Sequence, residues 1–271
     1  MEHRLEADPF NPGAFRVLAG DHAQSWVDPA DPLRLEFEYV QRISEVLDAT
    51  ILTASDDQRL RVVHLGGGGL SLPRWVAARR PHTAQIVCEP DAALTEQVRR
   101  ILPLPPRSGI KVRDVDGRAG IVAMPHDYAD AVVLDAFDGL QVPADLATEE
   151  FLDEVVLRLR PGGIFVANVT ARAPFGWSRQ FTAGVADRFR SVLVSAEAAV
   201  WKGRRMGNLV VAASGRSLPV PQLTRVAAAA PFPYQLKSGR ELERWLGGAS
   251  GLRDADATPS PGRAKVRGWF E

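Results

Sequence analysis

The chain has 271 residues, of which 45% are hydrophobic and 24% are charged, as in an ordinary globular protein. Its 33 basic and 33 acidic residues balance, which argues against bulk electrostatic binding to nucleic acid or to an anionic membrane. The single cysteine, Cys88, excludes an intrachain disulfide and a metal site built from several cysteines. No apolar run approaches the roughly 20 residues that span a bilayer, and the polar, acidic N-terminus is unlike a secretory signal. We therefore expect a cytoplasmic protein with no metal and no nucleic-acid or membrane partner.

Residues 1–55 are expected to form a small N-terminal segment of a β-hairpin and a helix. Residues 1–13 contain two prolines and a glycine and are expected to be a loose lead-in. Two short β-like runs, 14–19 and 23–27, predict a hairpin that packs on the main domain or on a second subunit, because an isolated hairpin is marginal. Apolar residues at helical spacing predict a helix over 35–52.

Residues 56–215 are expected to form the main domain, in which strands and helices alternate. The expected strands are 62–65, 86–88, 110–115, 131–134 and 164–169, and the expected helices are 70–80, 91–102 and 149–159. The strand 110–115 alternates with charged residues and is expected at an edge of the sheet.

After a helix over 177–189, the strands 192–199 and 209–213 lie only about nine residues apart. That distance leaves no room for a crossover helix, so the two strands must pair as an antiparallel hairpin. An α/β sheet that closes in this way is typical of the Rossmann-like, S-adenosylmethionine methyltransferase-type fold, whereas a nicotinamide-binding Rossmann fold continues with strand–helix units. Residues 216–271 are expected to form a C-terminal extension that is partly disordered, from Gly247 onward.

The stretch RVVHLGGGG, residues 61–69, is a short apolar run that ends in four glycines. A buried strand followed by such a loop brings the backbone close to a ligand, since no Cβ intervenes, and the next helix aims its N-terminal amides at the same point. Glu89 ends the second strand about 20 residues later, where an acid can accept both ribose hydroxyls of a nucleoside. Asp116 follows the third strand and could accept the adenine amine, although Asp-Gly is equally typical of a turn.

The most apolar strand runs into LDAFDGLQVP, which places Asp135 and Asp138 at the carboxyl ends of the strands. Open α/β sheets bind their ligands at this edge. Two acids that leave a buried strand are costly unless they are solvated or paired with cations, and a cationic amine would supply that pairing. The alternative for Asp138 is that it only begins the turn before Gly139.

Six motifs occur in the order and spacing of spermidine synthases: HLGGGG, CEPD, DVDG, DAFD, LRPGGIFVAN and GNLVVAAS. From about Ser25 to Ser214 the chain resembles this aminopropyltransferase family, and especially its divergent bacterial spermidine-synthase-like members. The resemblance implies transfer of an aminopropyl group from decarboxylated S-adenosylmethionine, the co-substrate, to a polyamine. It also implies a homodimer.

The resemblance also implies roles for individual residues. The donor site would comprise Gly66, Gly67, Gly68, Gly69, Glu89, Asp116 and Gly117. Asp135 corresponds to the family's catalytic acid, and Asp138 to its second acid, which helps to hold the amine. Tyr39 matches the tyrosine that touches the amine, and Gln41 on the same predicted helix is assigned to the amine site with it.

The sequence departs from the family at two places. The family has an aspartate directly after its three glycines, where this chain has Gly69, and its Asp-x-x-Asp-Pro loop is here DAFDGLQVPAD. Two alternatives therefore stay open. One is an S-adenosylmethionine-dependent methyltransferase in which Gly69 makes room for the donor's carboxylate, and the other is a nucleoside-binding protein without catalysis.

Overall fold

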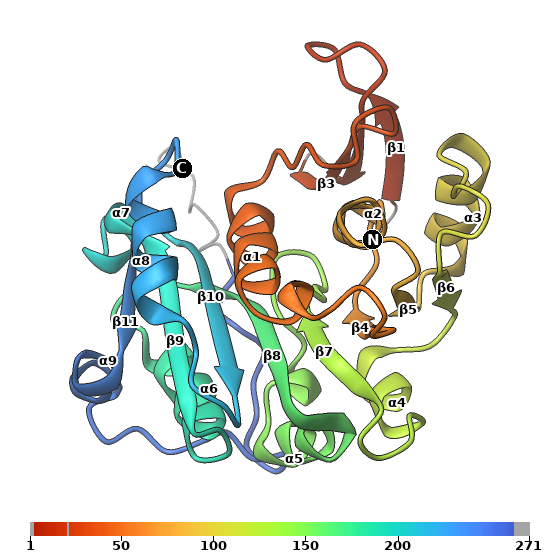
Figure 1. Ribbon diagram of the computed structural model, residues 1–271. Helices are drawn as coiled ribbons and strands as arrows, with labels where there is room; N and C mark the ends of the chain where they lie inside the picture. Colours follow the sequence, from red (N-terminus) through yellow and green to blue (C-terminus); the bar gives the residue numbers. More distant parts are fainter. Residues whose placement is uncertain (1–2, 21, 263–271) are drawn as a thin grey trace, which may run out of the picture.

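In the computed structural model, which describes residues 3–20 and 22–262, a mixed eight-stranded sheet forms the centre of the molecule (Figure 1). Its order is β11-β9-β10-β8-β7-β4-β5-β6. The strands are β4 (Arg61–Leu65), β5 (Ala84–Cys88), β6 (Ile110–Arg113), β7 (Ala129–Leu134), β8 (Leu159–Ala171), β9 (Ser191–Glu197), β10 (Gly207–Ser214) and β11 (Tyr234–Ser238). The strands β4 to β8 run parallel, whereas β10 pairs antiparallel with both β8 and β9. The predicted closing hairpin and the edge position of β6 are both confirmed.

Helices cover both faces of this sheet (Figure 1). They are α1 (Glu38–Ala49), α2 (Ser71–Arg79), α3 (Ala92–Ile101), α4 (Gly117–Val122), α5 (Glu149–Arg158), α6 (Gly176–Ala186), α7 (Ala198–Trp201), α8 (Val220–Ala229) and α9 (Gly239–Leu246), with short 3₁₀ turns η1 (Ile51–Thr53) and η2 (Ala144–Leu146). Alternate side chains of β4 enter different cores: Val63 and Leu65 pack on one face and Val62 on the other. None of the described helices is both long and apolar enough to cross a membrane.

Side-chain caps fix where three of the helices begin. Asp91, Asp116 and Thr148 each accept a hydrogen bond from the backbone N–H three residues on, at the start of α3, α4 and α5 respectively. The cap at Thr148 confirms the predicted start of α5. The helix α4 was not predicted, since its six residues include two glycines and carry no clear helical pattern.

The N-terminal segment is a three-stranded antiparallel sheet, β1 (His3–Ala7), β2 (Phe15–Ala19) and β3 (His22–Val27). The predicted hairpin is present as β2 and β3, but the predicted loose lead-in is wrong because β1 pairs along the whole of β2. This sheet packs on the main sheet, as expected, and shares with it a small core that includes Val17, Val27 and Leu70.

The expected disorder from Gly247 onward is wrong for residues 247–262. This segment has no apolar pattern of its own, but it is hydrogen-bonded to Val142, Glu149 and Trp177 of the main domain. The rest of the predicted disordered tail, residues 263–271, lies outside the described residues.

Candidate active site

A cavity of about 980 Å³ lies at the carboxyl ends of the parallel strands β4, β5, β7 and β8. The loops that follow these strands form one side of it, and residues from β3 and from the start of α1 form the other. A volume of this size suits a nucleoside together with a second small molecule. The edge of the sheet at which the strand pattern predicts ligand binding therefore contains a cavity.

The glycine loop after β4 and the carboxylate of Glu89 form one end of the cavity. Glu89 Oε2 accepts hydrogen bonds from the backbone N–H groups of Gly67 (2.9 Å) and Gly68 (3.2 Å), and its Oε1 accepts one from Asp91 (3.0 Å). These bonds hold the carboxylate at the floor of the cavity. At Gly66, where φ is +98°, a Cβ would overlap the backbone carbonyl of Asp135. The glycine thus lets the loop touch the end of β7.

Gly69 does not line the cavity, contrary to its assignment to the donor site. A Cβ at this position would lie 2.8 Å from Val27 Cγ2, 3.0 Å from Ser25 Oγ and 3.2 Å from Val17 Cγ2. The N-terminal sheet fills the space beside Gly69, so an aspartate could not stand there without displacing that sheet. The space beside Gly69 that the methyltransferase alternative reserves for the donor's carboxylate is thus occupied by Val17, Ser25 and Val27.

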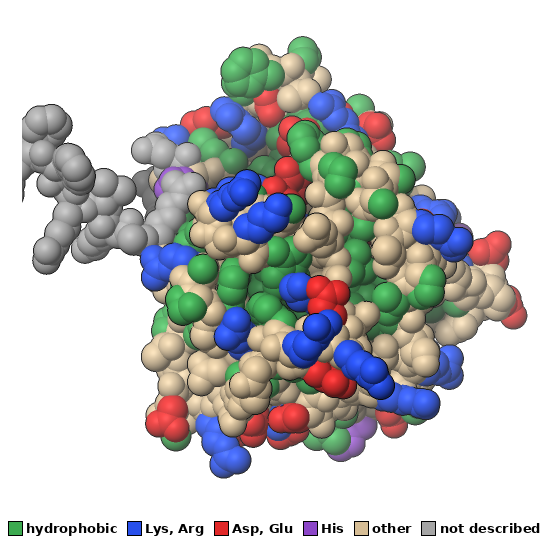
Figure 2. Space-filling model, turned by 90° about the vertical axis from the view of Figure 1, so that its left-hand side faces the viewer, with side chains coloured by type: hydrophobic (Ala, Val, Ile, Leu, Met, Phe, Trp, Pro, Cys, Tyr) green, Lys and Arg blue, Asp and Glu red, His purple; other side chains and the backbone are tan. Residues whose placement is uncertain are grey.

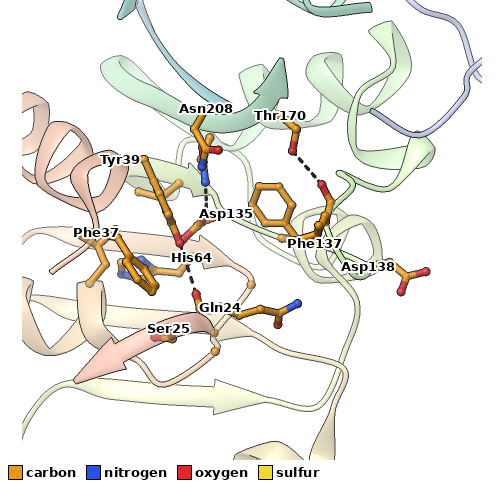
Figure 3. A pocket seen from close by; sticks show the side chains of 18 of the residues that line it. Gln24, Ser25, Phe37, Tyr39, His64, Asp135, Phe137, Asp138, Thr170 and Asn208 are labelled. Atoms are coloured by element: carbon orange, nitrogen blue, oxygen red, sulfur yellow. Dashed lines mark hydrogen bonds between the residues drawn. The ribbon is translucent and has the colours of Figure 1, made fainter. Parts of the chain in front are cut away.

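Asp135 lies at the centre of the cavity, directly after β7 (Figure 3). Its backbone N–H donates to Leu65 O (2.9 Å), and its Oδ1 accepts a hydrogen bond from Asn168 Nδ2 (2.8 Å). Burial raises the pKa of the Asp135 carboxyl to about 6, and the hydrogen bond from Asn168 partly opposes that shift. At neutral pH the group is therefore mostly ionised and can still take up a proton.

Tyr39 lies next to Asp135, with its hydroxyl in the cavity (Figure 3). Burial raises the pKa of Tyr39 well above its ordinary value, and the negative charge of Asp135 raises it further. The hydroxyl donates to Gln24 O at 3.4 Å, which ties α1 to β3 across the cavity. The structure therefore brings Tyr39 and Asp135 together, as predicted.

Gln41 does not line this cavity, although it lies only two residues beyond Tyr39. Its Nε2 donates to Leu35 O (2.6 Å), and its backbone N–H donates to Phe37 O (3.0 Å). Two residues correspond to about 200° of rotation around a helix, which turns Gln41 away from the side that carries Tyr39. The side chain instead ties down the segment that leads into α1.

Asp138 lines the cavity but is exposed, and Figure 3 shows its carboxylate directed away from Asp135 and Tyr39. Its backbone forms a tight turn, in which Asp138 N donates to Gln141 O (2.9 Å) and Gln141 N donates to Asp138 O (3.1 Å). Gly139 in this turn has a φ of +61°. The turn that we considered as an alternative for Asp138 is therefore present.

Asp116 and Gly117 lie at the end of the cavity that holds Glu89. Asp116 Oδ1 accepts from Ala119 N (2.7 Å) as the cap of α4, which leaves Oδ2 without a hydrogen bond among the described residues. Gly117 is buried, and a Cβ there would lie 3.2 Å from Leu146 and 3.3 Å from Leu65. The capping role and a ligand-binding role of Asp116 are thus compatible, because they use different oxygens.

Several residues at the cavity were not predicted, among them Asn168, Glu38 and Glu197. Asn168 is a buried polar residue within the apolar strand β8, and this contrast with its neighbours was the signal that could have revealed it. Burial raises the pKa of Glu38, and the adjacent carboxyl of Glu197 raises it further. Arg205 pairs with Glu197 at this end of the cavity. These residues meet only in the folded chain.

Acidic groups dominate the lining of the cavity. Nine described carboxylates line it, against only two arginines. His64 also lines the cavity, but burial lowers its pKa to about 4, so this histidine is neutral at pH 7. The carboxylates are Glu36, Glu38, Glu89, Asp91, Asp116, Asp135, Asp138, Asp145 and Glu197. A cavity of this charge favours a cationic ligand.

No protein-family model matches the sequence. A polyamine aminopropyltransferase of Vibrio vulnificus (strain CMCP6) is 29% identical over 171 residues, which make up 60% of this chain and 54% of that protein. One from Chromobacterium violaceum is 28% identical over 152 residues, or 56% of each chain. The chain thus matches about half the length of these curated relatives.

The crystal structure of a probable spermidine synthase from Corynebacterium glutamicum ATCC 13032 is similar over 98% of this chain and 95% of that one, with a TM-score of 0.86 and 27% identity. Human methyltransferase-like protein 13, whose structure contains SAH, matches 81% of this chain and 96% of its own, with a TM-score of 0.56 and 21% identity, and shows only that the fold is shared. In sequence the protein is thus similar to aminopropyltransferases, and along nearly its whole chain it is similar in structure to a probable spermidine synthase.

Proposed function

We propose that the protein transfers an aminopropyl group from decarboxylated S-adenosylmethionine to a polyamine. The observation that carries this proposal is the position of Asp135, a half-buried residue whose carboxyl pKa is raised to about 6, between the end of the cavity around Glu89 and an end lined by Glu38 and Glu197. A base in this place suits the deprotonation of an amine as it attacks a bound nucleoside donor. The sequence relatives named polyamine aminopropyltransferase support the same reaction.

The donor would occupy the end of the cavity around Glu89. Glu89 would accept hydrogen bonds from the ribose hydroxyls, and the free oxygen of Asp116 would accept one from the adenine amine beside Gly117. The loop Gly66–Gly68 would pass close to the sulfonium group. In this position the reactive carbon of the donor would face the centre of the cavity, where Asp135 lies.

The amine would occupy the other end. Its nitrogen forms a bond to the carbon next to the sulfonium, the carbon–sulfur bond breaks, and methylthioadenosine leaves. An alkylamine is protonated in water at pH 7, so it must lose a proton to react, and Asp135 is placed to take that proton. Tyr39 would orient the amine, and the carboxylates of Glu38 and Glu197 would hold its remaining ammonium groups. This positioning would supply much of the acceleration. Asp138 would join these carboxylates if its side chain turned inward.

The same geometry makes activity depend on pH. Asp135 must be ionised to act as a base, so kcat/KM should be highest above pH 6 and should fall as the pH drops through about 6. Asn168→Ala removes the hydrogen bond that favours the ionised form, and the acid limb of the profile should therefore move to higher pH. The check is the pH dependence of kcat/KM for the wild type, for Asn168→Ala and for Asn208→Ala. Asn208 lines the same cavity but is not among the described hydrogen-bond partners of Asp135. Equal profiles for all three would show that Asn168 does not tune the base.

A thermal-shift series tests which ligand the site accepts. A ligand that binds only the folded protein raises its melting temperature. Decarboxylated S-adenosylmethionine and methylthioadenosine should each raise it more than S-adenosylmethionine does, because the space at Gly69 is filled by Val17, Ser25 and Val27. A larger shift with S-adenosylmethionine would support the methyltransferase alternative. No shift with any of the three would contradict both enzymatic functions. The expected homodimer and cytoplasmic location stay predictions.

A further inference from the structure

The loop after Asp135 forms one wall of the cavity. We call residues 136–147 the wall loop. Its side toward the cavity includes Phe137, Leu140, Pro143 and Leu146. Two hydrogen bonds hold its first half: Gln24 Nε2 donates to Gly139 O, and Thr170 Oγ1 donates to Leu140 O, both at 2.9 Å. The wall loop begins next to the proposed base and ends at the cap of α5, so its position affects both ends of the cavity.

The second half of the wall loop is held from outside by the C-terminal segment, residues 250–262, which we call the strap. Figure 1 shows this blue segment leaving α9 and running back past α5. Ser260 and Val142 pair in both directions: Val142 N donates to Ser260 Oγ (2.8 Å), and Ser260 N donates to Val142 O (3.1 Å). Gln141 Nε2 also donates to Ser260 O (2.5 Å). Ser260 is fully buried, so water cannot replace these bonds.

A second contact joins the strap to the wall loop through Arg118 of α4. Arg118 binds both carboxylate oxygens of Asp254 at 2.6 Å each, and it also donates to Asp145 O at 3.1 Å. Bidentate pairs of this kind fix both partners in orientation. Arg118 directly follows Gly117, on which Leu146 of the wall loop packs. The strap is therefore linked to the end of the cavity where Asp116 lies.

The strap is also hydrogen-bonded to the rest of the domain, so it can hold the wall loop in a fixed position. Glu149 N donates to Leu252 O (2.6 Å), and Trp177 Nε1 donates to Thr258 O (2.8 Å). These two bonds fix the strap to the starts of α5 and α6. A segment attached at several points to rigid helices can hold a neighbouring loop in one place.

We propose that the strap positions the wall loop, with Ser260 and Arg118 as the positioning residues, and that it thereby sets the affinity of the cavity for its ligands. Neither residue lines the cavity, so each acts through the backbone of the wall loop. The effect on catalysis rests on the proposed function, whereas the effect on the loop does not. The loop that departs in sequence from the family's pattern is the one that the strap supports.

The first test is amide hydrogen exchange of the unliganded protein, which does not depend on any reaction. Ser260→Ala removes the acceptor of Val142 N, and Asp254→Ala removes the partner of Arg118 at an exposed site where folding is not at risk. Both variants should speed exchange in peptides covering 139–147 by about tenfold, the effect of one lost hydrogen bond on local opening. Ser178→Ala is the matched control, since Ser178 is equally buried but its hydroxyl has no hydrogen-bond partner among the described residues. Unchanged exchange in both strap variants would overturn the proposal.

The second test separates positioning from general destabilisation. Calorimetry should show that both strap variants bind methylthioadenosine about tenfold more weakly than the wild type, with Ser178→Ala unchanged. With an active enzyme, KM should rise while kcat at saturation stays within about twofold, since Asp135 is not altered. A fall in kcat with unchanged KM and unchanged binding would overturn the positioning role. If the wild type itself does not bind methylthioadenosine, the proposed function fails, and the exchange data alone decide whether the strap holds the loop.

Discussion

Replacing Asp135 by asparagine is expected to lower kcat by about 10²- to 10⁴-fold, the range over which a positioned general base contributes. Asparagine keeps the shape of the side chain and can still accept the hydrogen bond from Asn168, but it cannot take a proton from the attacking amine. Binding of methylthioadenosine should stay within about twofold, because Glu89 and the glycine loop are unchanged. Steady-state kinetics with decarboxylated S-adenosylmethionine and a polyamine, together with calorimetry, measure both effects.

Two controls accompany this variant. Asp138→Asn should have a smaller effect, mainly on KM for the amine, because its exposed carboxylate is directed away from Asp135.

A change in folding stability should not explain the loss of activity in Asp135→Asn. A carboxyl whose folded pKa is raised stabilises the fold when protonated, and this contribution is lost as the pH rises through about 6. At pH 8 the asparagine variant should therefore melt no lower than the wild type. Full activity in Asp135→Asn would remove Asp135 from the mechanism.

Glu89→Gln is expected to weaken binding of methylthioadenosine by about 10- to 100-fold. The two carboxylate oxygens of Glu89 serve different backbone donors, Gly67 and Gly68 on one side and Asp91 on the other. A glutamine amide has only one oxygen, so whichever way it turns, its NH₂ group faces at least one N–H donor. Each buried donor left without an acceptor costs about 1–3 kcal/mol, and a ribose hydroxyl loses its acceptor as well.

The control for this variant is Glu96→Gln. Glu96 is an exposed residue of α3 that does not line the cavity, so its loss should leave the affinity within about twofold. Calorimetric titration with methylthioadenosine measures both variants under the same conditions. An unchanged affinity in Glu89→Gln would place the nucleoside elsewhere in the cavity and would remove the basis for the donor site.

Seven of the eight strands of the main sheet could be predicted from the sequence, because most of them are buried apolar runs and the connections between them are restrictive, whereas the edge strand β11 was missed. The strand β7 is buried throughout and apolar from Ala131 to Leu134, and the gap between β9 and β10 is too short for a crossover. The fold class and the likeness to spermidine synthases are both confirmed. The strand β1 was missed because HRLEA has no apolar pattern, and its order comes from pairing with β2 and from His3, whose ring lies 2.6 Å from Asp91.

The strap was missed for a related physical reason. Apart from Leu252, its residues are small, polar or charged, so the composition resembles that of a disordered tail. Its order comes from acceptors and donors on Val142, Glu149 and Trp177, which are distant in sequence. The composition of a segment indicates how much apolar surface it can bury by itself. It does not indicate which hydrogen bonds the segment can form with residues that are distant in sequence.

The predicted positions of site residues agree with the structure where the residue directly follows a parallel strand. They are wrong where packing against another element determines the position of the residue. Glu89 and Asp135 lie at the cavity because each directly follows a parallel strand. Gly69 belongs to the same glycine run, yet the N-terminal sheet covers it, and the helical rotation after Tyr39 turns Gln41 away. The roles assigned to the residues at the cavity stay predictions until they are measured.

The most direct test of the account is to identify the amine product by mass spectrometry. The purified protein is incubated with putrescine or spermidine, and with either decarboxylated S-adenosylmethionine or S-adenosylmethionine as donor. An aminopropylated amine and methylthioadenosine are expected with the decarboxylated donor, and Asp135→Asn should form both about 10²- to 10⁴-fold more slowly. A methylated amine formed from S-adenosylmethionine, or no product from a protein that binds the decarboxylated donor, would contradict the account.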